Sequence, residues 1–450
     1  MPQAVEVCKP ALGIRLENSR AEYAPGDTIM GCVYRTSHTV SPSSSVSLRM
    51  SGRIQTRLND TNHRAPFNLI SPKHAQTIFE GPLHIAGDEH VWPFVMTVPK
   101  YVDPQHLDCN TKIDTYVPFD TRDHILPSTF KLDNFRRNEA FIEYFLQATL
   151  KISRKGNIET VSARLPFKVI NLSPKPPIVD FELKRSISSG SVSSYRLVPG
   201  MEDAKLSLSQ KMKQSLSTAS VPEFAFNLQV DAPRLLQLSN PNPVPFRLRV
   251  IPDRHRTSDS IRDVPQKIKL SSLSVQVATD TDIVFERSPS PHNLHESYEV
   301  DLRFMKAIRA QRKEIFIPCA HESLPIDVGR LSNLRLGPPG SVYPDTRLHG
   351  HFSLHPTFTT YNIRQSHRLL WKVCVEIAGE KFDTSGSQAV TLLTPCDERG
   401  SGPETEMNRG RHEDWIQPPE EEPPPSFAQV QKEDLDARGH EYNELNVIND

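Results

Sequence analysis

Apolar and polar residues alternate with a period of two along much of the chain, most clearly over residues 45–55. The apolar face of this stretch consists of Val46, Leu48, Met50, Gly52 and Ile54, and its polar face of Ser45, Ser47, Arg49, Ser51, Arg53 and Gln55. A period of two is typical of a β-strand with one buried face. We therefore expect a strand here, with its apolar face against a core.

The residues before this stretch predict a turn, a strand and a loop. In residues 24–27 (Ala-Pro-Gly-Asp), proline fixes φ at the second turn position and glycine tolerates a positive φ at the third, so a type II turn is expected. Residues 28–35 are rich in β-forming side chains and predict a strand. A loop rich in proline and serine is then expected to lead into the alternating stretch.

Further short strands predict a β-sandwich in the first part of the chain. They are expected over residues 76–85, 90–98, 141–152 and 161–170. Residues 101–123 are polar and contain two prolines, so they predict an insertion loop. Roughly seven or eight strands within about 160 residues are typical of a sandwich.

The alternation returns after residue 221 and predicts a second β-sandwich. Its apolar stripes consist of Phe224, Phe226, Leu228 and Val230, then Phe246, Leu248 and Val250, and later Leu369, Trp371, Val373, Val375 and Ile377. In residues 268–277 the apolar positions change phase at Ser271 and Ser272, which predicts a β-bulge. Residues 388–393 are expected to form the last strand.

These patterns divide the chain into four parts, and its length of 450 residues suits two cores better than one. We expect one sandwich over residues 1–175 and another over residues 221–396. Residues 176–220, rich in serine and basic residues, are expected to form a mobile linker. Residues 397–450 are acidic and rich in proline, and this composition predicts a disordered tail.

The charge distribution and the cysteines bear on partners and compartment. From residue 401 onward there are 13 acidic and 4 basic residues, a net charge of −9, so the first 400 residues carry +8 within the total of −1. A basic body suits acidic lipid headgroups or phosphorylated partners, although evenly spread, solvated charge would give the same total. The six cysteines form no CxxC pair, as expected of free thiols in the cytoplasm. We expect no signal peptide and no membrane helix.

Several short motifs resemble the arrestin fold, in particular the α-arrestins (arrestin-related trafficking adaptors). The first motif consists of Tyr23, Pro25, Gly26, Ile29, Gly31 and Val33, followed by Gly52. Leu126-Pro127-Ser128-x-Phe130 and the alternating run around Tyr144 are similar to LPxSF and IxYxLxAxL segments of arrestin-like N-terminal domains. One threonine between Ser128 and Phe130 departs from that pattern. Residues 356–369 resemble the segment before the late strands of arrestin C-terminal domains.

The resemblance implies an all-β protein with two arrestin-like, immunoglobulin-type β-sandwich domains. It implies a non-enzymatic adaptor that links membrane cargo to ubiquitin-dependent endocytosis and protein trafficking. Such a protein works in the cytoplasm and is recruited to the plasma membrane or endosomes. The implied partners are cargo tails, a HECT-type ubiquitin ligase and an acidic membrane surface, recognised through edge strands and basic surfaces. We expect no cofactor, nucleic acid or small-molecule substrate.

The tail bears on the ubiquitin role. α-Arrestins present a Pro-Pro-x-Tyr peptide to WW domains, and the nearest segment here is Pro424, Pro425, Ser426 and Phe427. Phenylalanine in the tyrosine slot loses a hydrogen bond of about 0.5–1.5 kcal/mol where one is made. The segment is either a weak WW ligand or part of a solvated tail. The missing tyrosine favours an alternative function, an arrestin-fold sorting scaffold of the retromer-subunit kind without a ubiquitin-ligase role.

Two further sets of residues are candidate sites. Ser186 and Ser188 follow Lys184 and Arg185, a context that basophilic kinases use, although such tripeptides also arise by chance. The histidines His349, His351 and His355 would share one face of an extended strand, and imidazole suits zinc or copper. A β-sandwich metalloenzyme that uses these histidines is therefore a further alternative function. The other interpretation is that the histidines are simply exposed at the end of a strand. Nucleotide-binding and hydrolase motifs are absent from the sequence.

Overall fold

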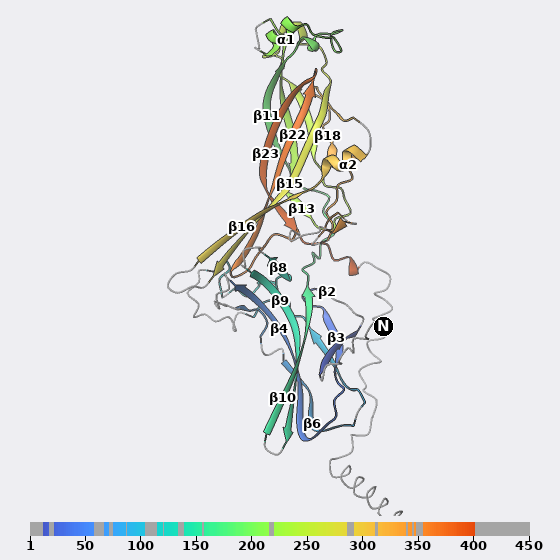
Figure 1. Ribbon diagram of the computed structural model, residues 1–450, viewed down its shortest axis with the longest axis vertical. Coiled ribbons are helices and arrows are strands. Elements are labelled where there is room, and N and C mark those ends of the chain that lie inside the picture. The colour runs from blue at the N-terminus through green and yellow to red at the C-terminus, as the bar shows by residue number, and fades with distance from the viewer. Residues whose placement is uncertain are drawn as a thin grey trace, which may run out of the picture.

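The chain is described by a computed structural model, in which most of the described residues belong to β-strands (Figure 1). The all-β prediction is thus confirmed. The described residues are 12–17, 22–57, 67–71, 75–86, 88–103, 115–119, 121–133, 139–154, 157–215, 220–285, 292–310, 314–338, 341–343, 346–347 and 354–400. Residues 401–450 of the predicted tail and most of the predicted insertion loop lie outside them.

Two sheets form the first group, drawn in blue to green in the lower part of Figure 1. The smaller sheet has the antiparallel order β1–β3–β7, with bounds Gly13–Leu16, Thr28–Arg35 and His90–Thr97. The larger sheet has the order β2–β10–β9–β4–β5, with bounds Glu22–Tyr23, Asn157–Val169, Glu139–Arg154, Thr39–Arg57 and Phe67–Asn68. In addition, β6 (Ala75–Ile85) pairs with β4, and β8 (Phe130–Asp133) pairs with β9.

The predicted turn and the strand that follows it are confirmed. The amide of Asp27 donates to the carbonyl oxygen of Ala24 at 2.9 Å, and Gly26 has φ +95°. The five predicted core positions of β4 are all buried, since the polar and apolar residues alternate as expected. Gln55 is an exception, because it was expected on the exposed face and is only 8% exposed.

The prediction of a loop before residues 45–55 is wrong, because β4 starts at Thr39 and continues through the serines. The Ser41 hydroxyl donates to the carbonyl oxygens of Ser43 and Ser153, and the Ser44 hydroxyl to that of Gly81. The pairing with β6 shifts register between Ser41 and Ser44. Side-chain hydrogen bonds thus satisfy backbone carbonyls at an irregular part of the strand, where a pattern of apolar residues is missing.

A second group of sheets forms the upper part of Figure 1. One sheet has the order β11–β12–β14–β18, with bounds Leu183–Ser193, Glu223–Pro233, Arg247–Pro252 and Ile326–Asp327. The other has the order β13–β23–β22–β15–β16, with bounds Leu235–Gln237, Glu380–Leu393, Ile363–Ile377, Ile268–Phe285 and His292–Asp301. Strands β17 (Phe316–Ile317) and β21 (Phe358–Thr359) extend this sheet, and β19 (Ser341–Tyr343) pairs with β20 (Thr346–Arg347).

In the described part of the chain the helices are short, and all but the last lie between strands. They are α1 (Leu208–Ser215), α2 (Phe304–Ala310), α3 (Val328–Leu331) and three 3₁₀ turns over Tyr195–Leu197, Asp259–Ile261 and Glu398–Gly400. The predicted phase change in β15 is confirmed, because its register with β22 shifts between Leu270 and Ser272.

The predicted mobile linker is corrected, because it contains β11, the 3₁₀ turn Tyr195–Leu197 and α1, from which Gln214 donates to Glu380. Residues 183–193 form β11, which pairs with β12 along its whole length. A Cβ atom on Gly190 would come within 2.4 Å of the ring of Phe382 on β23, so β11 needs small side chains where it crosses that ring. The large side chains that cover β11 belong to the facing sheet and not to β11 itself. The composition of β11 alone therefore predicts a linker where a strand forms.

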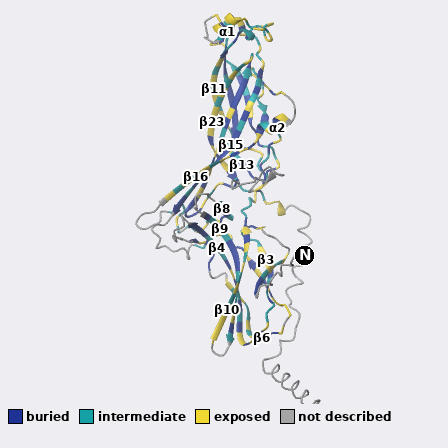
Figure 2. Ribbon diagram, viewed as in Figure 1, coloured by how far each residue is buried: buried dark blue, intermediate teal, exposed yellow. Residues whose placement is uncertain are grey.

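One long sheet reaches both hydrophobic cores. Val275 and Val277 of β15 belong to the core of the second group, whereas Ile283 and Val284 near its other end pack in the core of the first. Figure 1 shows the lower ends of β15 and β16 close to the upper end of the first group of sheets, and Figure 2 shows buried residues along β15. The two groups of sheets are therefore joined by shared apolar packing as well as by the chain.

Tyr144, one of the motif residues, gives a first prediction. Its ring packs on Gly52, where a Cβ atom would lie 2.5 Å from Tyr144 Cε1, and its buried hydroxyl donates to the carbonyl oxygen of Pro127 at 2.6 Å. Tyr144→Phe leaves that carbonyl unpaired, so we expect a loss of about 1–3 kcal/mol in the free energy of unfolding. Urea denaturation measures it against Tyr101→Phe, which alters a tyrosine that is 49% exposed. Equal midpoints for the two variants would contradict the prediction.

Candidate functional site

The long sheet carries a polar band where it passes from one core to the other. Thr279 and Thr281 of β15 lie directly opposite His367 and Gln365 of β22, and all four side chains are buried. Apolar pairs flank the band on both sides: Val277 with Leu369, and Ile283 with Ile363. Neutral polar groups thus separate the two cores along one face of a continuous sheet.

Two histidines lie at this junction. Nδ1 of His367 is 3.0 Å from the hydroxyl oxygen of Thr357, which also accepts from the amide of Leu392. His355 packs edge to face on the ring of Phe130, with ring centroids 5.4 Å apart. Burial lowers the pKa of His355 to about 4. Burial and the neighbouring His355 lower the pKa of His367 to about 4, so both imidazoles are neutral at pH 7.

Tyr361 joins the second group of sheets to the first core. Its ring stacks on those of Phe67 and Phe119 at centroid distances of 5.8 and 5.6 Å, and His124 meets it edge to face at 5.2 Å. The amide of Tyr116 donates to its carbonyl oxygen at 2.8 Å. Burial raises the pKa of Tyr361 to about 12. The sequence motif around residues 356–369 pointed to this segment but not to Tyr361 itself.

The end of the described chain returns to the first turn. The Asp397 amide donates to the carbonyl oxygen of Ser173 at 2.8 Å. The guanidinium of Arg399 donates to Asp397 at 2.8 Å and to Asp27 at 2.5 Å. These contacts connect the first residues of the predicted tail to the turn that carries the first motif, so the prediction of disorder is wrong for residues 397–400.

An outward face of the larger first sheet is rich in arginine, and we call it the arginine face. It consists of Arg49 and Arg53 on β4, Phe145 and Gln147 on β9, and Arg164 on β10. The guanidinium carbons of Arg164 and Arg53 lie 4.6 and 5.7 Å from the ring centroid of Phe145. The stacked side chains cover the ring, which is only 8% exposed although it points outward.

The arginines of this face differ in their partners. Arg53 forms an ion pair with Glu143, whereas Arg49 donates to the neutral amide oxygen of Gln147 at 3.0 Å. Within the described chain, no carboxylate pairs with Arg49 or Arg164. A cavity of about 330 Å³ opens on this face and is lined by residues from all three strands. The arginine face can therefore accept anionic groups.

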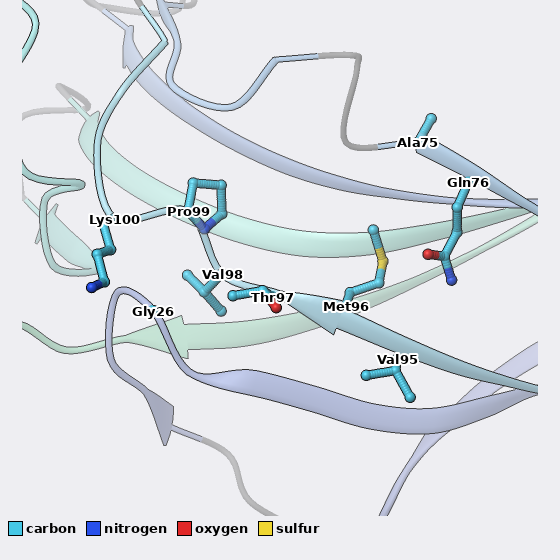
Figure 3. A pocket seen from close by; sticks show the side chains of 9 residues that line it. All are labelled: Gly26, Ala75, Gln76, Val95, Met96, Thr97, Val98, Pro99 and Lys100. Carbon is cyan, nitrogen blue, oxygen red and sulfur yellow. The ribbon is translucent and has the colours of Figure 1, made fainter. Parts of the chain in front are cut away.

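A second cavity, of about 420 Å³, lies where β6 and β7 approach the first turn (Figure 3). Its lining is mostly apolar, and Figure 3 shows Gln76 and Lys100 at opposite ends of it. Lys100 is the one ionisable side chain among the lining residues. None of the other lining residues carries an ionisable group that could form a nucleophile–base pair with Lys100.

The predicted site residues lie in different places. Ser188 faces β23 and accepts a hydrogen bond from Thr384 at 2.9 Å, and Ser186 is half-buried on the same strand. A kinase could reach either only after local opening of β11. His355 belongs to the junction, while His349, His351 and residues 424–427 lie outside the described residues.

The described part of the chain offers no group of three or more His, Cys, Asp or Glu side chains placed to hold a metal ion. Of its helices, none has both the length and the apolar character needed to cross a bilayer. The four described cysteines are free thiols, and burial raises the pKa of Cys319 to about 11. A scan against protein-family models and a search of curated proteins returned no match for this chain.

Proposed function

We propose that the protein is a non-enzymatic, arrestin-like adaptor that links membrane cargo to ubiquitin-dependent trafficking. In this proposal the two groups of sheets are two arrestin-like sandwich domains within residues 1–175 and 176–396, with β11 belonging to the second. The unpaired cations of the arginine face carry the proposal. They form a charged surface on the outward face of a sheet, and such charge can steer and select a complementary protein partner.

The surroundings of the motif residues support the arrestin resemblance. Gly31 and Gly52 each lie where a Cβ atom would collide, with the Arg15 backbone oxygen at 2.2 Å and with the Tyr144 ring at 2.5 Å. Both glycines are thus required by close packing within the first core. The same motif therefore accounts for several tight contacts of one sandwich, which favours a common architecture over a chance match.

The second candidate is a sorting scaffold of the retromer-subunit kind without a ubiquitin-ligase role. It is favoured by phenylalanine at position 427, where a WW ligand has tyrosine. Titration of a peptide of residues 415–435 with WW domains separates the two candidates. Binding supports the ubiquitin role, and no binding at millimolar concentration favours the scaffold.

Proximity labelling with the full chain in cells tests the proposal as a whole. We expect transmembrane transporters or receptors and HECT-type ligases among the labelled neighbours. Retromer subunits without ligases would replace the adaptor by the scaffold. A metabolite that co-purifies in stoichiometric amount and is turned over would overturn both.

A further inference from the structure

We propose that the open edge of β7 binds an extended apolar peptide of a partner protein, whose C-terminal carboxylate pairs with Lys100. The site is the cavity of about 420 Å³ between β7 and the start of β6 (Figure 3). It shares no residue with the arginine face, so it is a second binding surface, independent of the one that carries the proposed function.

The cavity is lined by the edge of a strand and not by one of its faces. Residues 95–100, from β7 and the segment that follows it, all contribute to the lining. Successive side chains of a strand point to opposite faces, so six residues in a row border one cavity through the backbone at the strand's edge. β7 is the last strand in the order β1–β3–β7, and this edge of it has no strand partner in the described part of the chain.

The hydrogen bonds to the first turn show which backbone groups of β7 point to the open edge. The amide of Val98 donates to the Asp27 carbonyl oxygen at 2.8 Å, and the Val98 carbonyl oxygen accepts from the amide of Gly26 at 2.9 Å. Along an antiparallel strand, residues that bond to the partner strand alternate with residues whose backbone groups point away from it. The amide and carbonyl groups of Val95 and Thr97 therefore point away from β3, toward the open edge.

Two prolines limit the length of this edge that can pair. Pro93 and Pro99 follow the same alternation as Val95 and Thr97, and proline has no amide to donate. Proline within a sheet is typical of an edge strand, where its nitrogen faces solvent. Between the two prolines, the amides of Val95 and Thr97 are the donors at the open edge. A pairing window of this length suits a short bound peptide and hinders open-ended pairing of strands.

The side chains around the cavity favour an apolar peptide. Met96 and Val98 are buried, whereas Val95 is 59% exposed and lies opposite Met30 of β3, which is also exposed. In a strand added to β7, inward-pointing side chains would cover Met96, and outward-pointing ones would cover Val95 and Met30. A mostly apolar lining with a few polar groups is typical of binding sites.

Lys100 places a positive charge at one end of the cavity, and Gln76 lies at the other (Figure 3). Neither side chain has a hydrogen-bond or ion-pair partner among the described residues. The nearby carboxylate of Asp27 is bonded to Arg399 instead. Because Lys100 follows Thr97 by three residues, a peptide that runs parallel to β7 would bring its carboxyl end to the ammonium group.

A peptide fits this cavity better than the acyl chain of a lipid, which matches only the apolar lining. An acyl chain would displace water from the backbone groups of Val95 and Thr97 without replacing their hydrogen bonds, which is unfavourable. A peptide backbone donates to and accepts from the same groups, and extended peptides bind sheet edges in this way. The apolar lining and the open edge are thus complementary to one kind of ligand.

Fluorescence anisotropy with the full chain tests the proposal. The probe is a fluorescein-labelled peptide, Gly-Ser-Val-Thr-Val-Thr-Val, with a free C-terminal carboxylate. We expect it to bind, and the amidated peptide to bind about fivefold more weakly. N-methylation of the two inner valines removes backbone donors and should weaken binding roughly tenfold or more. The same peptide with glycine in place of every valine should not bind, because it lacks the apolar side chains.

Variants of the protein separate this edge from the rest of the strand. Val95→Pro removes an amide that points away from β3, as Pro93 already does, and should weaken binding about tenfold. Val91→Pro makes the same change at an exposed position of the same alternation outside the cavity, and should leave binding unchanged. Lys100→Gln should lower the affinity for the free acid to that for the amidated peptide and leave the latter unchanged. Thermal unfolding checks that each variant is folded, and if Val95→Pro is not, the N-methylated peptide and Lys100→Gln decide the outcome.

Three results would overturn the inference. The first is equal affinity for the valine peptide and its N-methylated form. The second is no binding of the valine peptide at millimolar concentration. The third is a dimer of the full chain in analytical ultracentrifugation that Val95→Pro dissociates while no peptide binds, which would assign the edge to a second copy of the chain. None of them decides whether the protein is a trafficking adaptor, because proximity labelling tests that separately.

Discussion

Acidification from pH 7.5 to pH 5 is expected to lower the free energy of unfolding by about 4 kcal/mol through His355 and His367 alone. In the folded protein burial holds the pKa of each at about 4. In the unfolded chain histidine titrates near 6.5, so below that pH the unfolded state takes up protons that the folded state excludes. A pH of 5 lies about 1.5 units below the histidine pKa in the unfolded chain, so proton uptake there stabilises the unfolded state by roughly 2 kcal/mol for each histidine. The loss grows until about pH 4, where the folded protein also becomes protonated.

The measurement is the difference in unfolding free energy between the two pH values, obtained by urea denaturation. His355→Gln, His367→Gln should reduce that difference by about 4 kcal/mol, whatever its own stability at pH 7.5. His321→Gln, which alters an exposed histidine, should leave the difference as in the parent. Burial also lowers the pKa of His90 and His124, so some acid sensitivity will remain in the double variant. An unchanged difference in the double variant would refute the assignment.

Acid sensitivity at this place has a structural consequence. Both histidines lie where the two groups of sheets meet, His355 against Phe130 of the first group and His367 within the polar band. A proton on His367 would be buried in the polar band beside Thr279, which is unfavourable because burial disfavours the charged form. Asp280 lies near enough to raise the pKa of His367, but its effect is smaller than those of burial and His355. Protonation therefore weakens the junction more than either core.

The sequence was most informative where one strand face is buried and the other exposed. The turn at Gly26, the strand β3, the core positions of β4 and the bulge after Leu270 follow from the alternation and from turn chemistry. All four are local features, and a period of two records burial directly. Local features are also what short motifs describe, and the motif residues lie in the turn, β3 and β4 but not at the bulge.

The errors arose where distant residues decide the structure. β11 is held by hydrogen bonds to β12 and by the Phe382 ring, neither of which is visible in its own serine-rich sequence. The arginine face could be predicted only in part from the sequence. The alternation placed Arg49 and Arg53 on an exposed face, but Arg164 joins them through the register of β9 and β10, which the sequence pattern does not give. The junction depends on one sheet entering two cores, a property of topology that periodicity does not record.

Tyr361→Ala is expected to lower the stability of the first core by about 3–5 kcal/mol, the usual cost of removing a large buried aromatic ring. Tyr361 is fully buried between Phe67 and Phe119, so its loss leaves a cavity between rings that belong to that core. Tyr361→Phe is the matched control. The hydroxyl has no hydrogen-bond partner among the described residues, so removing it should leave stability unchanged or slightly higher.

Tryptophan fluorescence can assign this loss to one core, because Trp92 lies in the first core and Trp371 in the second. Tyr361 comes from the chain of the second group but packs in the first. Its truncation should therefore move the urea transition of Trp92 to lower concentration than that of Trp371, whereas in the parent the shared packing should make the two coincide. Variants that keep only one of the two tryptophans, with Trp415 replaced as well, report each core separately. Coincident transitions in Tyr361→Ala, at the parent's midpoint, would show that Tyr361 does not couple the cores.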